Sequence, residues 1–250
     1  MDYKMLVLDL DGTLTNSRKE VTEPTRKALI EIQEAGKIVV LASGRPINGV
    51  LPLAKKLELM RFGGYMLSFN GARISQCSTG KIIYNRTLPT SVIGPIFDIV
   101  KAYSGVDIIT YDDECIYSGL KVNRYVELEA SINKILIPGE PDVLKEIQKK
   151  LQEQFRSLLN IYFSEPYFLE IMPQNIDKAY SLQKLLNNLG LTADSMICCG
   201  DGYNDISMIE YAGLGVAMKN AQPIVKDTAD FITKSNDEDG ILHVINTFMR

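Results

Sequence analysis

Two aspartates, Asp9 and Asp11, end an unbroken apolar run near the start of the chain. The run predicts a short strand over Met5–Leu10, buried on both faces of a sheet. Carboxylates at the C-terminal end of such a strand lie at the rim of the sheet, where open α/β folds bind ligands. Two acids one residue apart repel each other there and lose solvation. The pair therefore indicates a bound cation, acid/base chemistry, or both.

Further polar clusters follow the same rule of position. Ser43–Arg45 comes directly after the apolar run Lys37–Ala42, and Asp201–Asp205 comes directly after Ser195–Cys199. Lys178 lies at the start of a predicted helix. Because the carboxyl ends of parallel strands share one edge of a sheet, we expect the clusters that follow strands to converge in space.

The combined residue types at this edge indicate a metal and a phosphate. Several carboxylates with an amide suit Mg²⁺, which prefers oxygen ligands and commonly pairs one or two carboxylates with waters and a phosphate. A serine in a glycine turn at a helix N-terminus, here Ser43 with Gly44, suits a phosphate because free N–H groups and the helix dipole favour anions. Lys178 adds a point charge for the same phosphate.

Both ends of the chain alternate strand and helix patterns. In the first helix, Thr22 is a plausible N-cap, Pro24 fits the first turn, and Gly36 follows the C-terminus. The pattern returns after Pro173, with Asp177 capping a helix that ends at Leu189. Strands alternating with helices predict a parallel sheet with right-handed crossovers. The fold class is therefore α/β, a doubly wound Rossmann-like core assigned to residues 1–82 and 173–250.

The middle of the chain, residues 83–172, has a different pattern of apolar and polar residues. Its predicted strands carry more alternation and more aromatic residues, and they cover Asp107–Tyr111, Cys115–Tyr117, Lys134–Ile137, Leu159–Phe163 and Tyr167–Ile171. Helical patterns lie between them at Val92–Tyr103, Val122–Ser131 and Pro141–Phe155. This combination predicts an inserted α+β module with an antiparallel sheet and helices on one face.

Composition restricts the class of protein. The net charge of −4 on 250 residues, with both signs mixed, argues against nucleic acid or an anionic membrane as the main partner. The start of the chain lacks the pattern of a signal peptide, and no apolar stretch approaches the ~20 residues of a membrane span. The four cysteines form no CxxC pair, so we expect reduced thiols in a cytoplasmic protein. His243, the only histidine, is expected to be structural.

These motifs carry a family resemblance. Asp9–Leu14, Ala42–Arg45, Lys178 and Gly200–Asp205 resemble, in order, the four motifs of the haloacid dehalogenase (HAD) superfamily. Further segments of the chain resemble the Cof-like hydrolases of that superfamily: Asn70–Ala72, Met208, Gly213–Met218, Asn220-Ala221 and Ser235–Gly240. The middle module resembles the large α/β cap of that family in position and size. One departure is Ala179 after Lys178, where the family often has glycine.

The resemblance implies roles for individual residues. Asp9 would be the nucleophile that forms an aspartyl phosphate, and Asp11 would be the general acid and then the base that activates water. Mg²⁺ would be held by Asp9, the backbone carbonyl of Asp11 and Asp201, with support from Asp205 and Asn204. Ser43, Gly44, Thr13 and Lys178 would hold the transferring phosphoryl group, and Arg45 and Asn70 are candidates for contact with the substrate.

Structural alternatives remain open for several of these residues: helix capping for Asp201, Asp205 and Ser43, a surface position for Lys178, and turn stabilisation for Thr13. Arg45 and Asn70 are equally compatible with a structural role. In the cap, Tyr111, Asp112, Asp113, Glu114 and Arg124 lie near strand–loop junctions, but a solvated face explains each of them more simply.

The expected function is a Mg²⁺-dependent phosphatase acting on a small-molecule phosphate ester, most often a sugar phosphate in this family. One alternative is a phosphomutase, which shares the chemistry of the two aspartates but returns the phosphoryl group to a sugar. A non-catalytic protein that binds a phosphorylated ligand is the other. The physiological substrate and the oligomeric state do not follow from the sequence.

Overall fold

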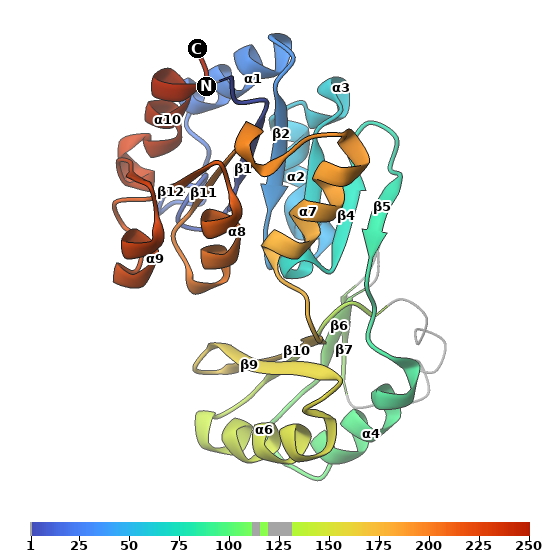
Figure 1. Ribbon diagram of the computed structural model, residues 1–250. Helices are drawn as coiled ribbons and strands as arrows, with labels where there is room; N and C mark the ends of the chain where they lie inside the picture. The colour runs from blue at the N-terminus through green and yellow to red at the C-terminus, as the bar shows by residue number, and fades with distance from the viewer. Residues whose placement is uncertain (1, 112–115, 120–131) are drawn as a thin grey trace. The chain divides into compact units, whose positions relative to one another are not determined.

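The computed structural model describes residues 2–111, 116–119 and 132–250. The chain divides into two compact units, one made of Met1–Tyr84 with Asp177–Arg250 and the other of Asn85–Ile176. The predicted helix Val122–Ser131 and the cap candidates Asp112, Asp113, Glu114 and Arg124 lie outside the described residues. Figure 1 shows the elements of both units.

The first unit is built on an eight-stranded sheet with the order β13-β12-β11-β1-β2-β3-β4-β5. Its strands are β1 (Met5–Leu8), β2 (Ile38–Ala42), β3 (Tyr65–Ser68), β4 (Arg73–Gln76), β5 (Ile82–Asn85), β11 (Met196–Gly200), β12 (Leu214–Ala217) and β13 (Phe231–Ile232). Neighbouring strands from β13 to β3 pair in parallel. The doubly wound parallel core that the sequence predicts is thus confirmed.

Strand order reverses between β1 and β11. From β1 the chain proceeds outward through β2 and β3, and after the insertion it returns to pair β11 with the other side of β1. The register aligns Leu8 with Leu41 on one side and with Cys199 on the other. The residues that follow these three strands therefore meet at a topological switch point, where open α/β sheets bind ligands.

Helices cover both faces of this sheet (Figure 1). One apolar core joins Leu6 and Leu8 to α1 (Glu23–Glu34), α2 (Ile47–Lys56), α3 (Leu59–Phe62), α9 (Pro223–Thr228) and α10 (Gly240–Phe248). The other joins Met5 and Val7 to α7 (Lys178–Leu189) and α8 (Ile206–Tyr211). Alternate residues of β1 thus enter opposite cores, which explains why every residue of this strand is apolar.

Local capping fixes the helices that carry the site. Thr22 is the N-cap of α1, and its side chain accepts a hydrogen bond from the Thr25 N–H. The carboxylate of Asp177 caps α7 by accepting a 2.7 Å hydrogen bond from the Tyr180 N–H. The helix ends at Leu189, and the following Gly190 adopts a left-handed φ of 66°. These three expectations agree with the structure.

The second unit is a five-stranded sheet with the order β7-β6-β8-β10-β9. Its strands are β6 (Ile109–Tyr111), β7 (Ile116–Ser118), β8 (Ile135–Pro138), β9 (Leu159–Glu165) and β10 (Phe168–Pro173). Among the described residues, neighbouring strands of this sheet pair antiparallel. Helices α4 (Thr90–Val100) and α6 (Pro141–Phe155) share one apolar core with the sheet residues Ile135, Ile137, Leu169 and Ile171. The antiparallel sheet and the helices of this unit agree with the α+β module that the sequence predicts.

Two strands of the first unit were not predicted, whereas the cysteines and His243 agree with the expectations. Strands β4 and β5 extend the sheet of the first unit beyond β3, and β4 runs antiparallel to β3. Cys77, Cys198 and Cys199 are free and buried, as expected of small core residues. The ring of His243 stacks on Phe231 and its Nδ1 lies 3.0 Å from the Thr233 hydroxyl, which agrees with a structural role.

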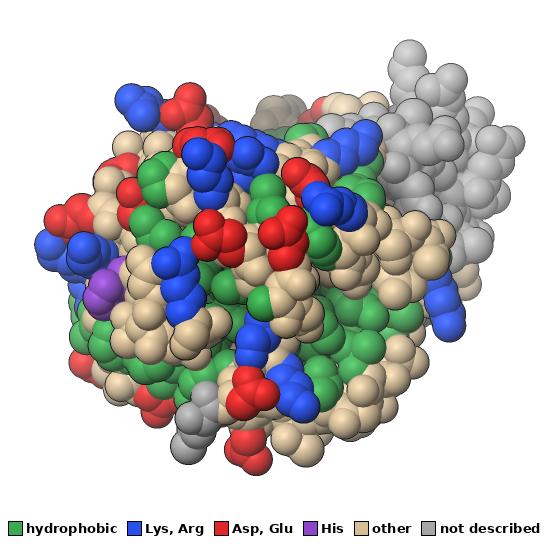
Figure 2. Space-filling view, turned by 90° about the horizontal axis from the view of Figure 1, so that it is seen from above, with side chains coloured by type: hydrophobic (Ala, Val, Ile, Leu, Met, Phe, Trp, Pro, Cys, Tyr) green, Lys and Arg blue, Asp and Glu red, His purple; other side chains and the backbone are tan. Residues whose placement is uncertain are grey.

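Charges of both signs are interspersed over the face of the molecule shown in Figure 2, with no large patch of one sign. In the described part of the chain, every helix is too short or too polar to cross a membrane.

Candidate active site

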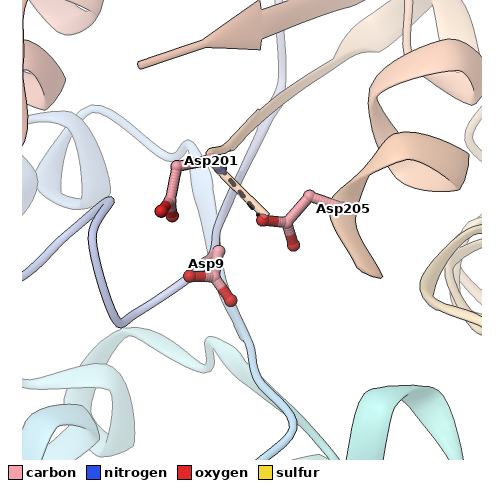
Figure 3. Close-up of side chains that lie close together, drawn as sticks. All are labelled: Asp9, Asp201 and Asp205. Carbon is pink, nitrogen blue, oxygen red and sulfur yellow. Dashed lines mark hydrogen bonds between the residues drawn. The ribbon is translucent and has the colours of Figure 1, made fainter. Parts of the chain in front are cut away.

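Three carboxylates from three segments meet at the switch point. Asp9 directly follows β1, Asp201 directly follows β11, and Asp205 ends the short 3₁₀ helix η4 (Tyr203–Asp205). Each offers one oxygen to a cluster in which the oxygens lie within 4.8 Å of one another (Figure 3). The sequence prediction that these residues converge at one edge agrees with this geometry.

Lys178 is the cation inside this cluster. Its side chain is fully buried, and its Nζ donates to Asp9 Oδ1 at 2.7 Å, to Asp205 Oδ1 at 2.6 Å and to the Ala42 carbonyl at 2.8 Å. The lysine therefore ties the ends of β1 and β2 to η4. A surface position for Lys178 is excluded.

Asp205 is held from both sides. Its Oδ2 accepts a 3.0 Å hydrogen bond from the backbone N–H of Asp201 (Figure 3) and another of 3.0 Å from that of Gly202. Its Oδ1 accepts from Lys178. By contrast, Asp9 Oδ2 and Asp201 Oδ2 accept no hydrogen bond within the described residues. Two oxygens in the cluster are thus available to a ligand. Asp205 instead holds the ammonium of Lys178 and the main chain at Asp201 and Gly202 in place.

The three carboxylates of the cluster outweigh the single positive charge of Lys178. Burial, followed by the charge of Asp205, raises the pKa of Asp9 to about 7, although Lys178 acts in the opposite direction. Burial also raises the pKa of Asp201 to about 6, against the hydrogen bond from Thr13 that lowers it. Burial lowers the pKa of Lys178, but Asp205 and Asp9 outweigh it and raise that pKa. The lysine remains charged, yet it does not fully compensate three carboxylates.

The donor set fits a hard divalent cation. Asp9 and Asp201 each present one uncommitted carboxylate oxygen, and the raised pKa of each reports the cost of holding both charged without a cation. Mg²⁺ takes oxygen ligands, usually one or two carboxylates with waters and a phosphate. Asp205 and Asn204 would support these ligands from η4.

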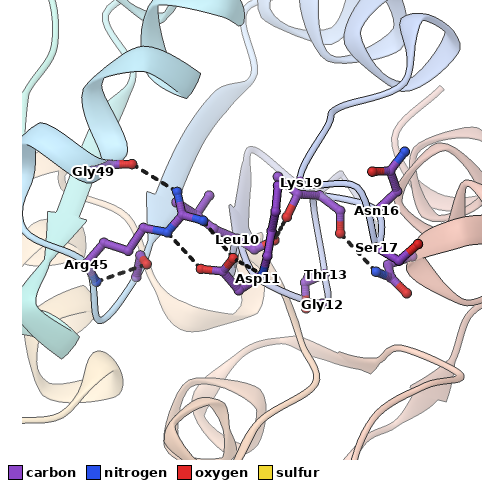
Figure 4. A network of polar contacts seen from close by, with 12 residues as sticks. Leu10, Asp11, Gly12, Thr13, Asn16, Ser17, Lys19, Arg45 and Gly49 are labelled. Carbon is purple, nitrogen blue, oxygen red and sulfur yellow. Dashed lines mark hydrogen bonds and ion pairs between the residues drawn. The ribbon is translucent and has the colours of Figure 1, made fainter. Parts of the chain in front are cut away.

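Asp11 lies beside the cluster, in an ion pair of its own (Figure 4). Arg45 donates Nε to Asp11 Oδ2 at 2.8 Å and Nη2 to Asp11 Oδ1 at 2.7 Å, while Lys19 Nζ donates to Oδ1 at 2.7 Å. Burial raises the pKa of Asp11, but the hydrogen bonds from Arg45 and Lys19 outweigh it and lower that pKa. Lys19 was missed in the sequence because its turn shows no motif.

The turn after β2 is organised around Ser43. The side chain of Ser43 is buried, and its Oγ accepts a 3.2 Å hydrogen bond from the Arg45 N–H, so it caps the turn before α2. Asn70 approaches from the end of β3, where a Cβ on Gly44 would lie 2.9 Å from Asn70 Oδ1. The same Oδ1 accepts a 3.0 Å hydrogen bond from Asn204 Nδ2. Asn70 thus joins the turn at Ser43 to η4.

Thr13 and Gly12 lie against Asp201. The buried hydroxyl of Thr13 donates to Asp201 Oδ1 at 2.7 Å. Gly12 has a φ of +87°, and a Cβ there would lie 2.3 Å from Asp201 Oδ2. The structure therefore shows the Thr13 hydroxyl bound to Asp201, and the predicted contact of Thr13 with the phosphate stays a prediction.

Comparison with known proteins shows the family of this chain. The family described as haloacid dehalogenase-like hydrolase matches residues 6–125 and 119–245, which together span almost the whole chain. The chain belongs to the haloacid dehalogenase-like hydrolases. The resemblance to Cof-like HAD hydrolases that the motifs indicated is confirmed, and so is an enzyme of the phosphatase class.

Individual HAD relatives match over their full length. A putative phosphatase of Bacillus subtilis, YxeH, is 31% identical, with 98% of this chain and 97% of YxeH covered. The 5-amino-6-(5-phospho-D-ribitylamino)uracil phosphatase YcsE of the same organism is 32% identical, with coverage of 98% and 95%. A haloacid dehalogenase-like hydrolase from Bacteroides thetaiotaomicron superposes with a TM-score of 0.91 at 43% identity, covering 98% of this chain and 99% of that one.

Proposed function

We propose that this HAD hydrolase is a Mg²⁺-dependent phosphatase that cleaves small phosphate monoesters through an aspartyl phosphate on Asp9. The observation that carries the proposal is the cluster at the switch point: Asp9 and Asp201 each keep one oxygen uncommitted while Lys178 holds the other oxygen of Asp9. Bound Mg²⁺ would neutralise the repulsion between the phosphate dianion and the attacking carboxylate.

Asp9 has the position of a nucleophile. The hydrogen bond from Lys178 fixes the rotamer of its carboxylate, and the side chain is only 10% exposed, so it loses little solvation when substrate enters. Attack of its free oxygen on phosphorus would form the Asp9–phosphate bond and break the bond to the leaving alkoxide.

Asp11 serves the proton transfers in this proposal. Its carboxyl would give a proton to the leaving oxygen and then take one from the water that hydrolyses the aspartyl phosphate. The ion pair with Arg45 favours the ionised form, which is the form that accepts a proton from water. The protonated form needed for the first step requires that substrate weaken this ion pair.

The transferring phosphoryl group would contact Lys178 and the turn at Ser43 and Gly44. Lys178 Nζ already lies between the ends of β1 and β2, and the Ser43 turn leads into the N-terminus of α2. An ammonium and a helix N-terminus both favour an anion.

For substrate, we propose small phosphorylated metabolites with a sugar-like carbon chain. Support comes from YcsE, whose name specifies a phosphoribityl compound and which is 32% identical to this chain. The second unit, Asn85–Ile176, is proposed as the cap that decides among such esters.

A panel of phosphate esters tests the proposal. Phosphate release is measured from sugar phosphates, sugar-alcohol phosphates and nucleotides, with Mg²⁺ and with EDTA. We expect turnover with Mg²⁺ on members of the sugar and sugar-alcohol groups, and none with EDTA. Asp9→Asn is the matched control and should lose roughly 10³-fold or more in kcat while remaining folded.

Three results would count against this proposal. A folded wild-type protein that releases no phosphate from any ester in Mg²⁺ would contradict a phosphatase. Interconversion of sugar-phosphate isomers without release of phosphate would identify a phosphomutase instead. Unchanged turnover in Asp9→Asn would refute the choice of nucleophile.

A further inference from the structure

The tail motif of the chain, Ser235–Gly240, and the nearby Asn220 have no part in the proposed chemistry, yet they contact the loop that follows β1. Asn220 Nδ2 donates a 2.8 Å hydrogen bond to the Gly12 carbonyl. Asn236, the first residue of η5 (Asn236–Glu238), donates its backbone N–H to Asn220 Oδ1 and its Nδ2 to the Thr15 carbonyl, both at 3.0 Å.

The loop held in this way determines where Asp201 lies. Thr13 Oγ1 donates to Asp201 Oδ1 at 2.7 Å, and Gly12 packs so closely on the same carboxylate that only a hydrogen fits in place of its side chain. A displacement of the Gly12–Thr13 peptide would therefore move or release the Asp201 carboxylate.

The residues around Asn220 also bind the main chain at Asp201. Two residues after Asn220, the Gln222 N–H donates a 3.0 Å hydrogen bond to the Asp201 carbonyl. Two residues before Asn220, the Met218 N–H donates a 3.0 Å hydrogen bond to the Gly200 carbonyl. The segment Met218–Gln222 thus binds the main chain of Asp201 directly and its side chain through Gly12. Within the described residues, neither Asn220 nor Asn236 hydrogen-bonds a carboxylate of the site itself.

We infer that Asn220 and Asn236 are positioning residues for the metal site: together they hold the Gly12–Thr13 peptide so that Asp201 presents its free oxygen to Mg²⁺. This inference rests on the proposed metal-dependent function. Partners that orient a metal ligand without touching the metal typically change affinity by ~10–100-fold when removed. Because Asn220 acts through Gly12 and Thr13, we expect about tenfold, the lower end of that range.

The test is the affinity of the full-length protein for Mg²⁺ alone, measured by titration calorimetry without substrate. Asn220→Ala should bind Mg²⁺ about tenfold more weakly, and Asn236→Ala should change in the same direction. Asn236→Ala keeps the backbone N–H that binds Asn220 Oδ1 and loses only the contact with the Thr15 carbonyl, so its loss should be smaller than that of Asn220→Ala and should add to it in the double variant. The exposed side chain of Asn220 makes this variant well suited to remain folded.

Asp237→Ala is the matched control. Asp237 belongs to the same tail and accepts a 2.8 Å hydrogen bond from the Ser17 N–H of the same loop, but this contact lies away from Gly12. In about 0.15 M salt, which screens the change in charge, its affinity for Mg²⁺ should equal that of the wild type.

Three outcomes would overturn the inference. If wild type binds Mg²⁺ and Asn220→Ala binds it equally, Asn220 does not position the site, while the proposed function stands. If Asp237→Ala weakens binding as much as Asn220→Ala, the tail merely stabilises the loop. If wild type binds no Mg²⁺, the proposed metal site and this inference fail together.

Discussion

Arg45 binds the carboxylate of Asp11 at two points, with Nε 2.8 Å from Oδ2 and Nη2 2.7 Å from Oδ1 (Figure 4). The guanidinium is anchored in turn by a hydrogen bond from Nη1 to the Gly49 carbonyl at 3.1 Å. The proposed acid/base residue is therefore held by a cation fixed to the start of α2. Four predictions follow from this pair and its surroundings.

The first prediction concerns the pH dependence of turnover. Arg45 lowers the pKa of Asp11, so Asp11 keeps its charge as the pH falls, and the step that needs the carboxylate as a base persists at low pH. In Arg45→Ala this pKa rises, and the acidic limb of the kcat profile should move to higher pH. Lys19→Ala should move it less, because the Lys19 side chain is 64% exposed and solvent screens its charge. Identical acidic limbs in wild type and Arg45→Ala would contradict this role.

The second prediction concerns Mg²⁺ and protons. In the metal-free protein the pKa of Asp9 is raised to about 7 and that of Asp201 to about 6, so both carboxyls bind protons more tightly when folded than when unfolded. Their contribution to stability is full below the unfolded pKa of about 4 and is lost as the pH rises through 6 and 7. Mg²⁺ bound to these carboxylates would replace those protons.

We therefore expect Mg²⁺ to raise the unfolding temperature more at pH 8 than at pH 5.5, and to release protons when it binds near pH 6.5. Thermal unfolding with and without Mg²⁺ measures the first effect, and calorimetry in buffers of different ionisation enthalpy measures the second. Asp201→Asn should abolish most of both. An equal stabilisation at the two pH values would show that these carboxyls do not hold the cation.

The third prediction concerns the buried lysine. Lys178→Met leaves Asp9 and Asp205 without their shared cation, and removing one partner of a buried ion pair typically costs about 3–5 kcal/mol. Denaturant unfolding of the metal-free protein at pH 8 should show a loss of this order, with a smaller loss at pH 5.5, where Asp9 is protonated. Lys184→Met, an exposed change on the same helix, is the control and should alter stability little. Equal effects of the two variants would contradict the coupling.

The fourth prediction separates the backbone of Asn70 from its side chain. Asn70 has a φ of 50°, a left-handed conformation that asparagine and glycine tolerate better than alanine. Asn70→Gly should therefore be more stable than Asn70→Ala by about 1 kcal/mol. Both variants lose the acceptor for Asn204, so their kcat values should fall to a similar extent. Urea unfolding with steady-state kinetics makes the comparison, and full activity in Asn70→Gly would show that the side chain is dispensable.

The strands and the position of the site could be predicted because their signals are local. The apolar run before Asp9 and the one before Asp201 each end in carboxylates, and parallel pairing brings such ends together whatever the strand order. Thr22 and Asp177 predicted where α1 and α7 begin, because an N-cap residue binds backbone N–H groups only a few positions away.

The contacts of Lys19 and Thr13, and strands β4 and β5, could not be predicted, because the sequence carries no local signal for them. Lys19 meets Asp11 only because its turn folds back on the end of β1, and neither residue type nor spacing indicates this. The bond from Thr13 to Asp201 joins two loops that lie far apart in the sequence. Strands β4 and β5 carry polar residues such as Arg73, Gln76 and Asn85, which mask the apolar pattern of a buried strand.

The central place of β1 has a consequence for how the chain acquires its activity during synthesis. β1 pairs with β2 on one side and with β11 on the other, and β11 is made only after the whole second unit. A nascent chain that ends before Met196 therefore leaves one hydrogen-bonding edge of β1 unpaired, and such edges invite aggregation. Asp201 and Asp205 come directly after β11, so the strand that closes this edge also brings the other two carboxylates of the cluster to Asp9.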